Sequence, residues 1–468
     1  MLRLVFARTP RVNKSLNPPS ISSNIPRNMS TYNVSPFTRA VVASMRQLYP
    51  ESLADKSFDN TGLLVEAPFI PAHPRNRNSV LLTIDLTRAV ADEAIENNHS
   101  VVVAYHPIIF RSLKAITSDD TQQLSMTLLL AHGISVYCPH TAVDQVPNGM
   151  ADWLCDVVTG KVDSPEPEAY TAGQSPLASA SSDTEVTTSE SELDLNGSLE
   201  GGDSDTSTKP TSHSDALTDP FIASPTTPKP KDKLRRLRPD AAHRTYSKPT
   251  YPRPTSNFHP SALSHTRAVV TPSPRDAIDA ANQFTGSSTY NTSNTGAGRL
   301  ITFDEAQPLT VLITRIAHAI GLPKGFSVAI PQGQDLEKIE IKTVGTCPGS
   351  GGSVLRKCNA DLIFTGELSH HEALAITERG GCVISLFHSN SERGYLWGTM
   401  RDKLEKQILQ EWPKVKEEEL SERDVSSAVK EVLNDDDIEV VVSERDRDPY
   451  GIVILDETVV EGINLGSA

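Results

Sequence analysis

The stretch DLIFTGELSHHEALAITERGGCVISLFHSNSERGY, residues 361–395, contains the pattern that decides the fold. DLIFTGE and CVISLF are short apolar runs of the kind that form buried strands. HHEALAITERGG, which lies between them, is long enough for a helix and ends in two glycines. Two strands joined by a helix normally lie parallel in one sheet. This stretch therefore predicts a strand–helix–strand unit.

The same alternation recurs along the rest of the chain. Further strands are predicted at VLLTID (80–85), VVVAY (101–105), ISVYC (134–138) and IEIKTVGT (339–346). Helices are predicted from Pro36 after Ser35, over Thr87–Asn97, over 120–131, and from Leu396 onward, where apolar residues recur every fourth position. Strands that alternate with helices predict an α/β architecture with largely parallel sheets.

A long polar tract interrupts this pattern. The chain has 468 residues, a net charge of -15 and only 37% hydrophobic residues. The deficit comes from a Ser-, Thr-, Pro- and Asp-rich tract that cannot bury enough apolar surface to offset its ordering entropy, so we expect it to be disordered. The predicted division is a leader (1–28), a first α/β lobe (29–163), a disordered insert (164–298) and a second α/β lobe (299–468).

Charge within the insert is segregated. Acidic residues gather between Asp183 and Asp219, and the basic run KDKLRRLR (231–238) follows. The basic run is either a nuclear-localisation or nucleic-acid contact, or a solvated stretch that balances its acidic neighbour. We favour the second interpretation and do not expect direct nucleic-acid binding. The insert is also a candidate surface for protein partners.

The leader and the cysteines bear on the compartment. The first 28 residues contain five Arg or Lys residues, and no acid precedes Glu51, which is the composition of a mitochondrial presequence. The alternative is a leader that carries no targeting signal. Met29 offers a second translation start. We expect the protein in the cytoplasm, in mitochondria or in both, and the nucleus is a further alternative. Five cysteines without a CxxC motif favour a reducing compartment, and no apolar run reaches the ~18 residues that span a membrane.

Polar residues follow four of the predicted strands at the point where each strand ends. They are His106 after VVVAY, His140 and Asp144 after ISVYC, Glu367, His370 and His371 after DLIFT, and His388 and Glu392 after CVISLF. Ligands of open α/β sheets bind beyond the carboxyl ends of the strands. Imidazole with carboxylate suits zinc, iron, manganese or nickel. The alternative for His388 and Glu392 is that they bind no metal and only begin the helix that follows.

Several blocks of the sequence resemble a known family. YHPIIF (105–110), HTAVD (140–144), TGELSHHEAL (365–374) and HSNSERGYL (388–396) are similar to signature blocks of the Nif-three (NGG-one-interacting factor three) family. FDNTGLLVE (58–66) and SERDRDPYGIV (443–453) fit the same family. Its bacterial members often carry the label GTP cyclohydrolase 1 type 2.

The resemblance implies two similar α/β lobes that face a metal-bearing cleft, assembled as a toroidal homohexamer with a dinuclear site. The metal ligands implied by matching residues are His106, Asp144, His388 and Glu392, with the two carboxylates as bridges between one or two divalent ions per chain. Tyr105 departs from the bacterial pattern, which has a second histidine there. Either His140 or water would complete that shell, or the second ion binds weakly.

The function implied by the resemblance is a divalent-metal-dependent hydrolase that acts on a nucleotide-like substrate, as in GTP cyclohydrolase chemistry. Glu367 is a candidate general base or an orienting group, and His371 a candidate substrate contact or a solvent-facing helix start. The loop CPGSGGS (347–353) could hold a phosphate or be only a turn. The alternative function is a non-catalytic metal-binding regulatory protein with transcription-related partners.

Overall fold

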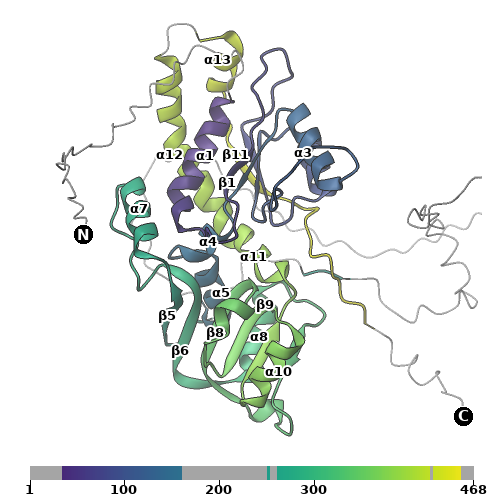
Figure 1. Cartoon of the computed structure of the whole chain (residues 1–468), viewed down its shortest axis with the longest axis vertical. Helices are drawn as coiled ribbons and strands as arrows, with labels where there is room; N and C mark the ends of the chain where they lie inside the picture. Colours follow the sequence, from purple (N-terminus) through teal and green to yellow (C-terminus); the bar gives the residue numbers. More distant parts are fainter. Residues whose placement is uncertain (1–33, 161–249, 253–260, 422–424, 455–468) are drawn as a thin grey trace, which may run out of the picture. The chain divides into compact units, whose positions relative to one another are not determined.

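Two β-sheets with helices on their faces make up the described part of the chain (Figure 1). The computed structural model describes residues 34–160, 250–252, 261–421 and 425–454. The predicted α/β architecture is confirmed. Among the described helices, none combines the length and the apolar composition needed to cross a membrane.

The first sheet has five strands in the order β1–β4–β3–β2–β11. Their bounds are Gly62–Val65 for β1, Ser135–Cys138 for β4, Val101–Ala104 for β3, Ser79–Thr83 for β2 and Glu439–Val442 for β11. The neighbouring strands from β4 to β11 are parallel, and only β1 runs antiparallel to its neighbour. The largely parallel pairing predicted from the sequence holds for this sheet.

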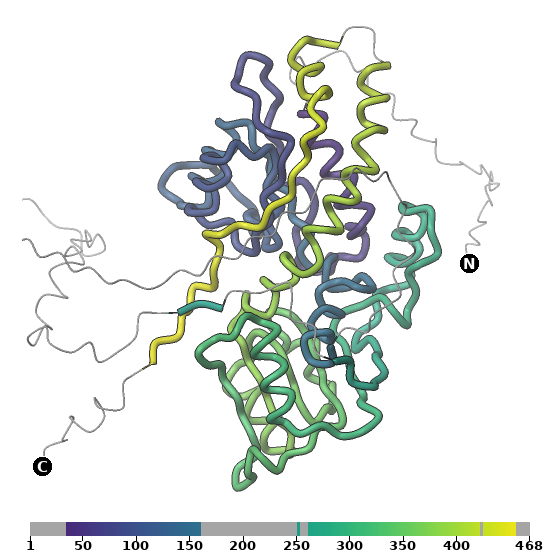
Figure 2. Tube along the Cα trace, turned by 180° about the vertical axis from the view of Figure 1, so that it is seen from behind, coloured from purple at the N-terminus to yellow at the C-terminus, as the bar shows by residue number. Residues whose placement is uncertain are grey.

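Helices bury both faces of the first sheet, as its unbroken apolar strands require. Val80 and Leu82 of β2 lie in one core cluster with α1 (Pro36–Leu48) and α12 (Arg401–Leu420). Leu81 points to the opposite face, where α2 (Arg88–Glu96) and α3 (Thr121–Ala131) pack. Figure 2 shows α1 and α12 side by side from behind, and Phe37 and Trp412 join them edge to face. The short α13 (Ser427–Leu433) packs against α1.

The second sheet has six strands in the order β5–β6–β8–β9–β10–β7. Their bounds are His265–Pro272 for β5, Gly296–Pro308 for β6, Glu340–Ser350 for β8, Leu362–Glu367 for β9, Cys382–Ser385 for β10 and Ser327–Ala329 for β7. β8, β9 and β10 are parallel to one another, as the opening sequence stretch predicts. The other pairs are antiparallel, so the expectation of a largely parallel sheet fails here. The strands β5 and β6, which lie at one end of this sheet, come from residues for which no regular strand was predicted.

Helices again cover both faces of the second sheet. One face packs against α5 (Met150–Thr159) and α8 (Leu309–Ala319), and the other carries α9 (Gly352–Leu355) and α10 (His370–Glu378). The remaining helical segments are η1 (Glu51–Leu53), α4 (Thr141–Gln145), α7 (Arg275–Thr285), η2 (Leu336–Lys338), η3 (Ser389–Ser391), α11 (Arg393–Tyr395) and η4 (Leu396–Met400). The helix predicted from Leu396 thus begins with the π-turn η4 and continues as α12.

The insert boundary predicted at residue 298 is wrong. Residues 261–298 contain β5, α7 and the start of β6, although the sequence analysis assigned them to the disordered insert. β5 is only half-buried, and backbone hydrogen bonds to β6 hold it in place. Such bonds do not require apolar side chains, so the sequence shows no apolar pattern there. Most of the predicted insert (residues 164–249 and 253–260) and the whole leader lie outside the described residues.

The two parts of the chain exchange elements. α5, which was predicted in the first lobe, packs its Leu154 and Val158 into the core beside the second sheet. β11, which was predicted in the second lobe, pairs in parallel with β2 of the first sheet. The first sheet therefore gains a strand, and the core beside the second sheet gains a helix, from the other side of the insert.

Candidate metal centre

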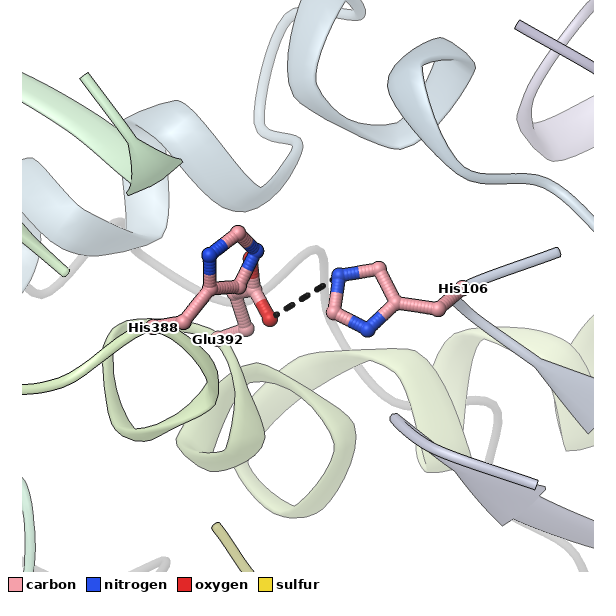
Figure 3. A group of neighbouring side chains, drawn as sticks. All are labelled: His106, His388 and Glu392. Carbon is pink, nitrogen blue, oxygen red and sulfur yellow. Dashed lines mark ion pairs between the residues drawn. The ribbon is translucent and has the colours of Figure 1, made fainter. Parts of the chain in front are cut away.

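Three side chains from distant parts of the chain meet at the ends of strands β3 and β10. His106 follows β3, His388 follows β10, and Glu392 lies between η3 and α11. His106 Nε2 is 3.6 Å from Glu392 Oε2, and His388 Nε2 is 3.5 Å from Glu392 Oε1. Figure 3 shows His106 reaching toward Glu392 and His388 from the opposite side. One donor atom of each residue lies within 4.8 Å of the others, a spacing that could hold a metal ion.

Glu392 is the buried member of this cluster. Its residue is 1% exposed, and its Oε2 atom has no hydrogen-bond partner in the described structure. A buried carboxylate oxygen without a donor is costly, because it has lost its water without gaining a partner. Two imidazole nitrogens face this oxygen pair, so a cation shared by the three side chains would satisfy it.

In both histidines, the nitrogen Nδ1 forms a hydrogen bond with a carboxylate. His106 Nδ1 is 2.9 Å from Asp85 Oδ1, and His388 Nδ1 is 2.9 Å from Glu367 Oε1. When Nδ1 donates to a carboxylate, Nε2 is left with its lone pair, which is the tautomer that binds a metal. Glu367 is more exposed than Asp85, so its bond orients the ring less firmly. Both rings are therefore oriented with Nε2 toward Glu392, and a metal ion would displace the proton that His106 carries at its raised pKa.

The local charge favours a cation. Burial alone would lower the pKa of His106, but the charge of Glu392 and the hydrogen bond that His106 donates to Asp85 outweigh it and raise this pKa to about 10. Burial would raise the pKa of Asp85, yet its hydrogen bond and charge interaction with His106 lower it. The carboxylates thus attract positive charge to the position where the two rings meet.

A loop that follows β11 supports both sides of the centre. Asp446 forms an ion pair with Arg393 at 2.8 Å, and Arg393 in turn lies 3.8 Å from Asp85. Asp448 accepts hydrogen bonds from the backbone N–H and hydroxyl of Ser389, next to His388. The C-terminal block of the family resemblance therefore positions the centre without touching the Nε2 atoms.

A second cluster lies beside the first. The Tyr105 hydroxyl donates to Asp144 and is 2.9 Å from both carboxylate oxygens. Burial and the nearby Asp144 raise the pKa of Tyr105 well above its usual value, so the phenol stays neutral. Burial and the charges of Glu392 and Asp59 raise the pKa of Asp144. His140 has its own carboxylate, with Nδ1 2.6 Å from Asp59 Oδ1.

The backbone around the centre is constrained. Gly349 has φ +59, and a Cβ there would lie 2.6 Å from Glu392 Oε1 and 2.9 Å from His388 Nε2. Only glycine allows the backbone at the end of β8 to approach these two side chains so closely. His140 and Phe387 also have positive φ, at 32 and 68, a strained conformation that often marks functional sites.

A cavity of about 440 Å³ opens onto both clusters. Of the candidate residues, the cavity is lined by His106, His140, Asp144, His388 and Glu392. Glu367 does not line it and instead holds His388. His371 does not line it either, and its ring packs against His370 at the start of α10. The structure thus joins most of the predicted set and leaves His371 apart.

Sequence reasoning missed the residues that support the centre. Asp85, Asp59 and Arg393 were each inside a quoted segment, but none was assigned a role. Asp85 could have been identified from the sequence, because it is a polar residue at the end of the strand-like run VLLTID, just as His106 follows VVVAY. Asp59 and Arg393 carry no such local signal, since their partners lie far away in the chain.

Comparisons with known proteins agree with the resemblance of the sequence blocks. A family described as Duf34/NIF3 (NGG1p interacting factor 3) matches residues 38–420. The protein NIF3 homolog of Schizosaccharomyces pombe is 34% identical over 378 residues, 80% of this chain and 91% of that protein. NGG1-interacting factor 3 of Saccharomyces cerevisiae is 27% identical over 78% of this chain and 89% of its own length. A crystal structure of a Bacillus cereus protein related to NIF3 aligns with TM-score 0.48 at 16% identity, covering 88% of this chain and 98% of that one.

Proposed function

The chain belongs to the Duf34/NIF3 (NGG1p interacting factor 3) family, and from that premise we propose that it is a divalent-metal-dependent hydrolase. One observation carries the proposal. The Nε2 atoms of His106 and His388 converge on Glu392, a buried carboxylate with an unpartnered oxygen. A divalent cation would accept a lone pair from each of these three side chains.

The donor set suits a catalytic ion. Two imidazoles and one carboxylate are typical ligands of zinc, iron, manganese or nickel. Three protein ligands leave a coordination position free, and the cavity lies where that position would open. A divalent ion there would polarise a substrate and lower the pKa of a bound water. The chain's own contribution is to orient both rings through Asp85 and Glu367.

We propose a single ion per chain as the resident form, in place of the dinuclear site that the resemblance implies. A carboxylate bridges two ions only if each oxygen offers a lone pair to one of them. The hydroxyl of Tyr105 instead lies within hydrogen-bond distance of both oxygens of Asp144. Asp144 is therefore engaged with a neutral phenol where a second metal ligand would be needed, and His140 lies outside the group of donor atoms around Glu392.

Among the candidate catalytic residues, Glu367 is assigned as a positioning residue. Its carboxylate is engaged with His388 Nδ1 and stands outside the cavity lining. His371 has no contact with the centre that would give it a step in the reaction. The substrate that we propose is nucleotide-like, as the resemblance to GTP cyclohydrolase 1 type 2 proteins implies.

Metal reconstitution tests the proposal. Full-length protein stripped with a chelator would be reloaded with zinc, manganese, iron or nickel and assayed against nucleobases, nucleosides, nucleotides and phosphodiesters. Hydrolysis should rise with metal occupancy and level off at about one ion per chain. Asp144→Ala serves as a comparison that changes the cavity wall and spares the three ligands. Full occupancy without turnover of any compound would contradict the hydrolase.

A second candidate function is a binding protein whose metal is structural. The printed name of the Saccharomyces cerevisiae relative describes an interacting factor, which suggests protein partners. On this view the acidic and basic insert contacts the partner, and a homohexamer presents several copies of it. Light scattering of the purified chain tests the hexamer, and a monomeric mass would reject it.

The leader supports a proposal on location. We propose that its basic, acid-free composition directs the protein to mitochondria, and that chains started at Met29 stay in the cytoplasm. A fluorescent fusion to residues 1–40 tests the address. Uniform cytoplasmic fluorescence of that fusion would show that the leader carries none.

A further inference from the structure

The cavity above the candidate metal centre is lined by acids and histidines, without a lysine or arginine among its described residues. The carboxylates come from Asp55, Asp144 and Glu392. A divalent ion on His106, His388 and Glu392 would offset these acids rather than leave a surplus of positive charge. Phosphate groups are normally held by Arg, Lys or backbone N–H groups. Part of the segment 347–353 also lines the cavity, but the Gly349 N–H already donates to the Ser391 hydroxyl, and no lysine or arginine there would offset the acids that a polyphosphate meets.

Two aromatic rings stand at this cavity with much of their surface in solvent. Phe58 is 52% exposed and Phe110 is 50% exposed, and their ring centroids are 6.3 Å apart. Both belong to loops, one before β1 and one after β3. Half-exposed phenylalanines that line one cavity together are unusual on a folded surface and offer flat apolar area to a ligand. Such rings bind a planar ring by stacking.

Polar groups on the wall can recognise the edge of that ring. Gln145 is buried, and its Oε1 accepts a hydrogen bond of 2.6 Å from Ser273. The amide nitrogen of Gln145 is then the end of the side chain available to donate. Ser350 and Ser353 also line the cavity and are exposed. The wall therefore offers hydrogen-bond donors and acceptors without net positive charge.

We propose that this cavity binds an uncharged planar nitrogen heterocycle, of nucleobase or nucleoside size, with its ring on Phe58 and Phe110. The proposal rests on the proposed metal-dependent hydrolase and narrows its substrate from nucleotides to their unphosphorylated forms. A volume of about 440 Å³ lies in the range of pockets that enclose small ligands. The ring would lie between the aromatic pair and the metal centre.

A second cavity that His106 also lines does not supply a phosphate site. It is a cavity of about 910 Å³ that contains Arg88, Arg445 and Arg447. Arg88 pairs with Asp92, Arg445 pairs with Glu96, and Arg447 lies over the ring of Tyr251. A phosphate would have to displace these partners, so the second cavity gives no free charge to a nucleotide that enters the aromatic cavity.

A charge series of ligands tests the proposal. Binding of adenosine, guanosine, cytidine and uridine to the full-length, metal-loaded protein is compared with binding of their mono- and triphosphates by calorimetry at low salt. At least one nucleoside or its free base should bind, and affinity should fall by about tenfold or more from nucleoside to triphosphate. A triphosphate that binds more tightly than its nucleoside overturns the proposal, as does failure of every base and nucleoside to bind.

Variants of the aromatic pair separate this proposal from the metal site. Phe58→Ala and Phe110→Ala should each weaken nucleoside binding by about tenfold and leave metal content unchanged. Phe284→Ala, which removes an equally exposed ring from α7 outside the cavity, is the matched control. Equal affinity of all three variants would overturn the stacking site even if metal and hydrolysis were as proposed.

A gain-of-charge variant provides the opposite test. Ser353→Lys adds a cation to the exposed wall at α9 and replaces none of the three metal ligands. Monophosphates should then bind about as well as nucleosides or better, reversing the wild-type order. An unchanged order of affinities would show that charge at this wall does not select the ligand, and would contradict the proposal.

Discussion

Two clusters of similar composition line the same cavity but leave different atoms unsatisfied. In the first, Glu392 has a buried oxygen with no donor, and two histidine Nε2 atoms face it. In the second, both oxygens of Asp144 lie within reach of the hydroxyl of Tyr105. The comparison teaches that a metal site depends on which donors the protein leaves unpaired, and that counting His and Asp residues does not reveal it.

The histidines sharpen the contrast. His106 and His140 each hold a carboxylate at Nδ1, from Asp85 and Asp59 respectively, and their ring centroids are 5.5 Å apart. Only His106 faces the buried carboxylate of Glu392 with its other nitrogen. Two equivalent carboxylate–histidine pairs therefore have different roles, because only one of them points at an unsatisfied acid.

The largest effect is expected from Glu392→Gln. Glutamine keeps the size of the side chain but removes the charge that a divalent ion requires, so bound metal should be lost. A ligand at 100 times its Kd stabilises the folded state by about 2.7 kcal/mol, so the Tm of the variant should match that of chelator-treated wild type. Metal analysis and thermal melting with and without chelator measure both effects.

The control for this change is Glu305→Gln, an exposed glutamate on β6. It should retain wild-type metal content and the full response of Tm to chelator. If Glu392→Gln keeps its metal, the centre described here is not the binding site, and Glu392 is an ordinary helix-start residue.

A smaller effect is expected from Asp85→Asn, compared with Asp59→Asn. Loss of the carboxylate that orients His106 should weaken metal binding by about 10–100-fold. The same change beside His140 should leave metal affinity unchanged, because His140 does not face Glu392. Competition with a fluorescent chelator measures the affinities. A similar loss in both variants would make His140 a ligand and remove the distinction between the clusters.

Tyr105→His should open the second cluster. The substitution removes the phenol from Asp144 and adds a nitrogen donor beside it, so a second, weaker ion should bind. Metal titration should then rise above the wild-type stoichiometry of about one ion per chain. A variant that still holds a single ion would mean that Tyr105 is not what keeps the second position closed.

The smallest effect on metal is expected from Tyr105→Phe. This variant deletes the hydroxyl without adding a donor, so metal content should stay at the wild-type value. It leaves the carboxylate of Asp144 without its hydrogen bond, which should lower the free energy of unfolding by about 1–3 kcal/mol. Denaturant unfolding measures the loss. Undiminished stability together with a gain of metal would instead indicate that the hydroxyl excludes an ion without supporting the fold.

Local patterns in the sequence determined the strands, most helices and the positions where polar residues follow strands. The runs VVVAY and CVISLF predict β3 and β10, and His106 and His388 lie directly beyond them. These features follow from the burial of neighbouring residues, which leaves a regular apolar pattern in any short window. The metal-binding candidates could therefore be named before their distances were known.

Only the tertiary structure decided how distant segments combine. The pairing of β11 with β2, the packing of α5 on the second sheet and the order of residues 261–298 depend on partners far away in the chain. The bond from Tyr105 to Asp144 likewise has no local signature, because a hydrogen bond between separate elements leaves no periodicity. The sequence by itself thus determined which polar residues follow the strands, while the fold decided which of them converge and which of their atoms remain unpaired.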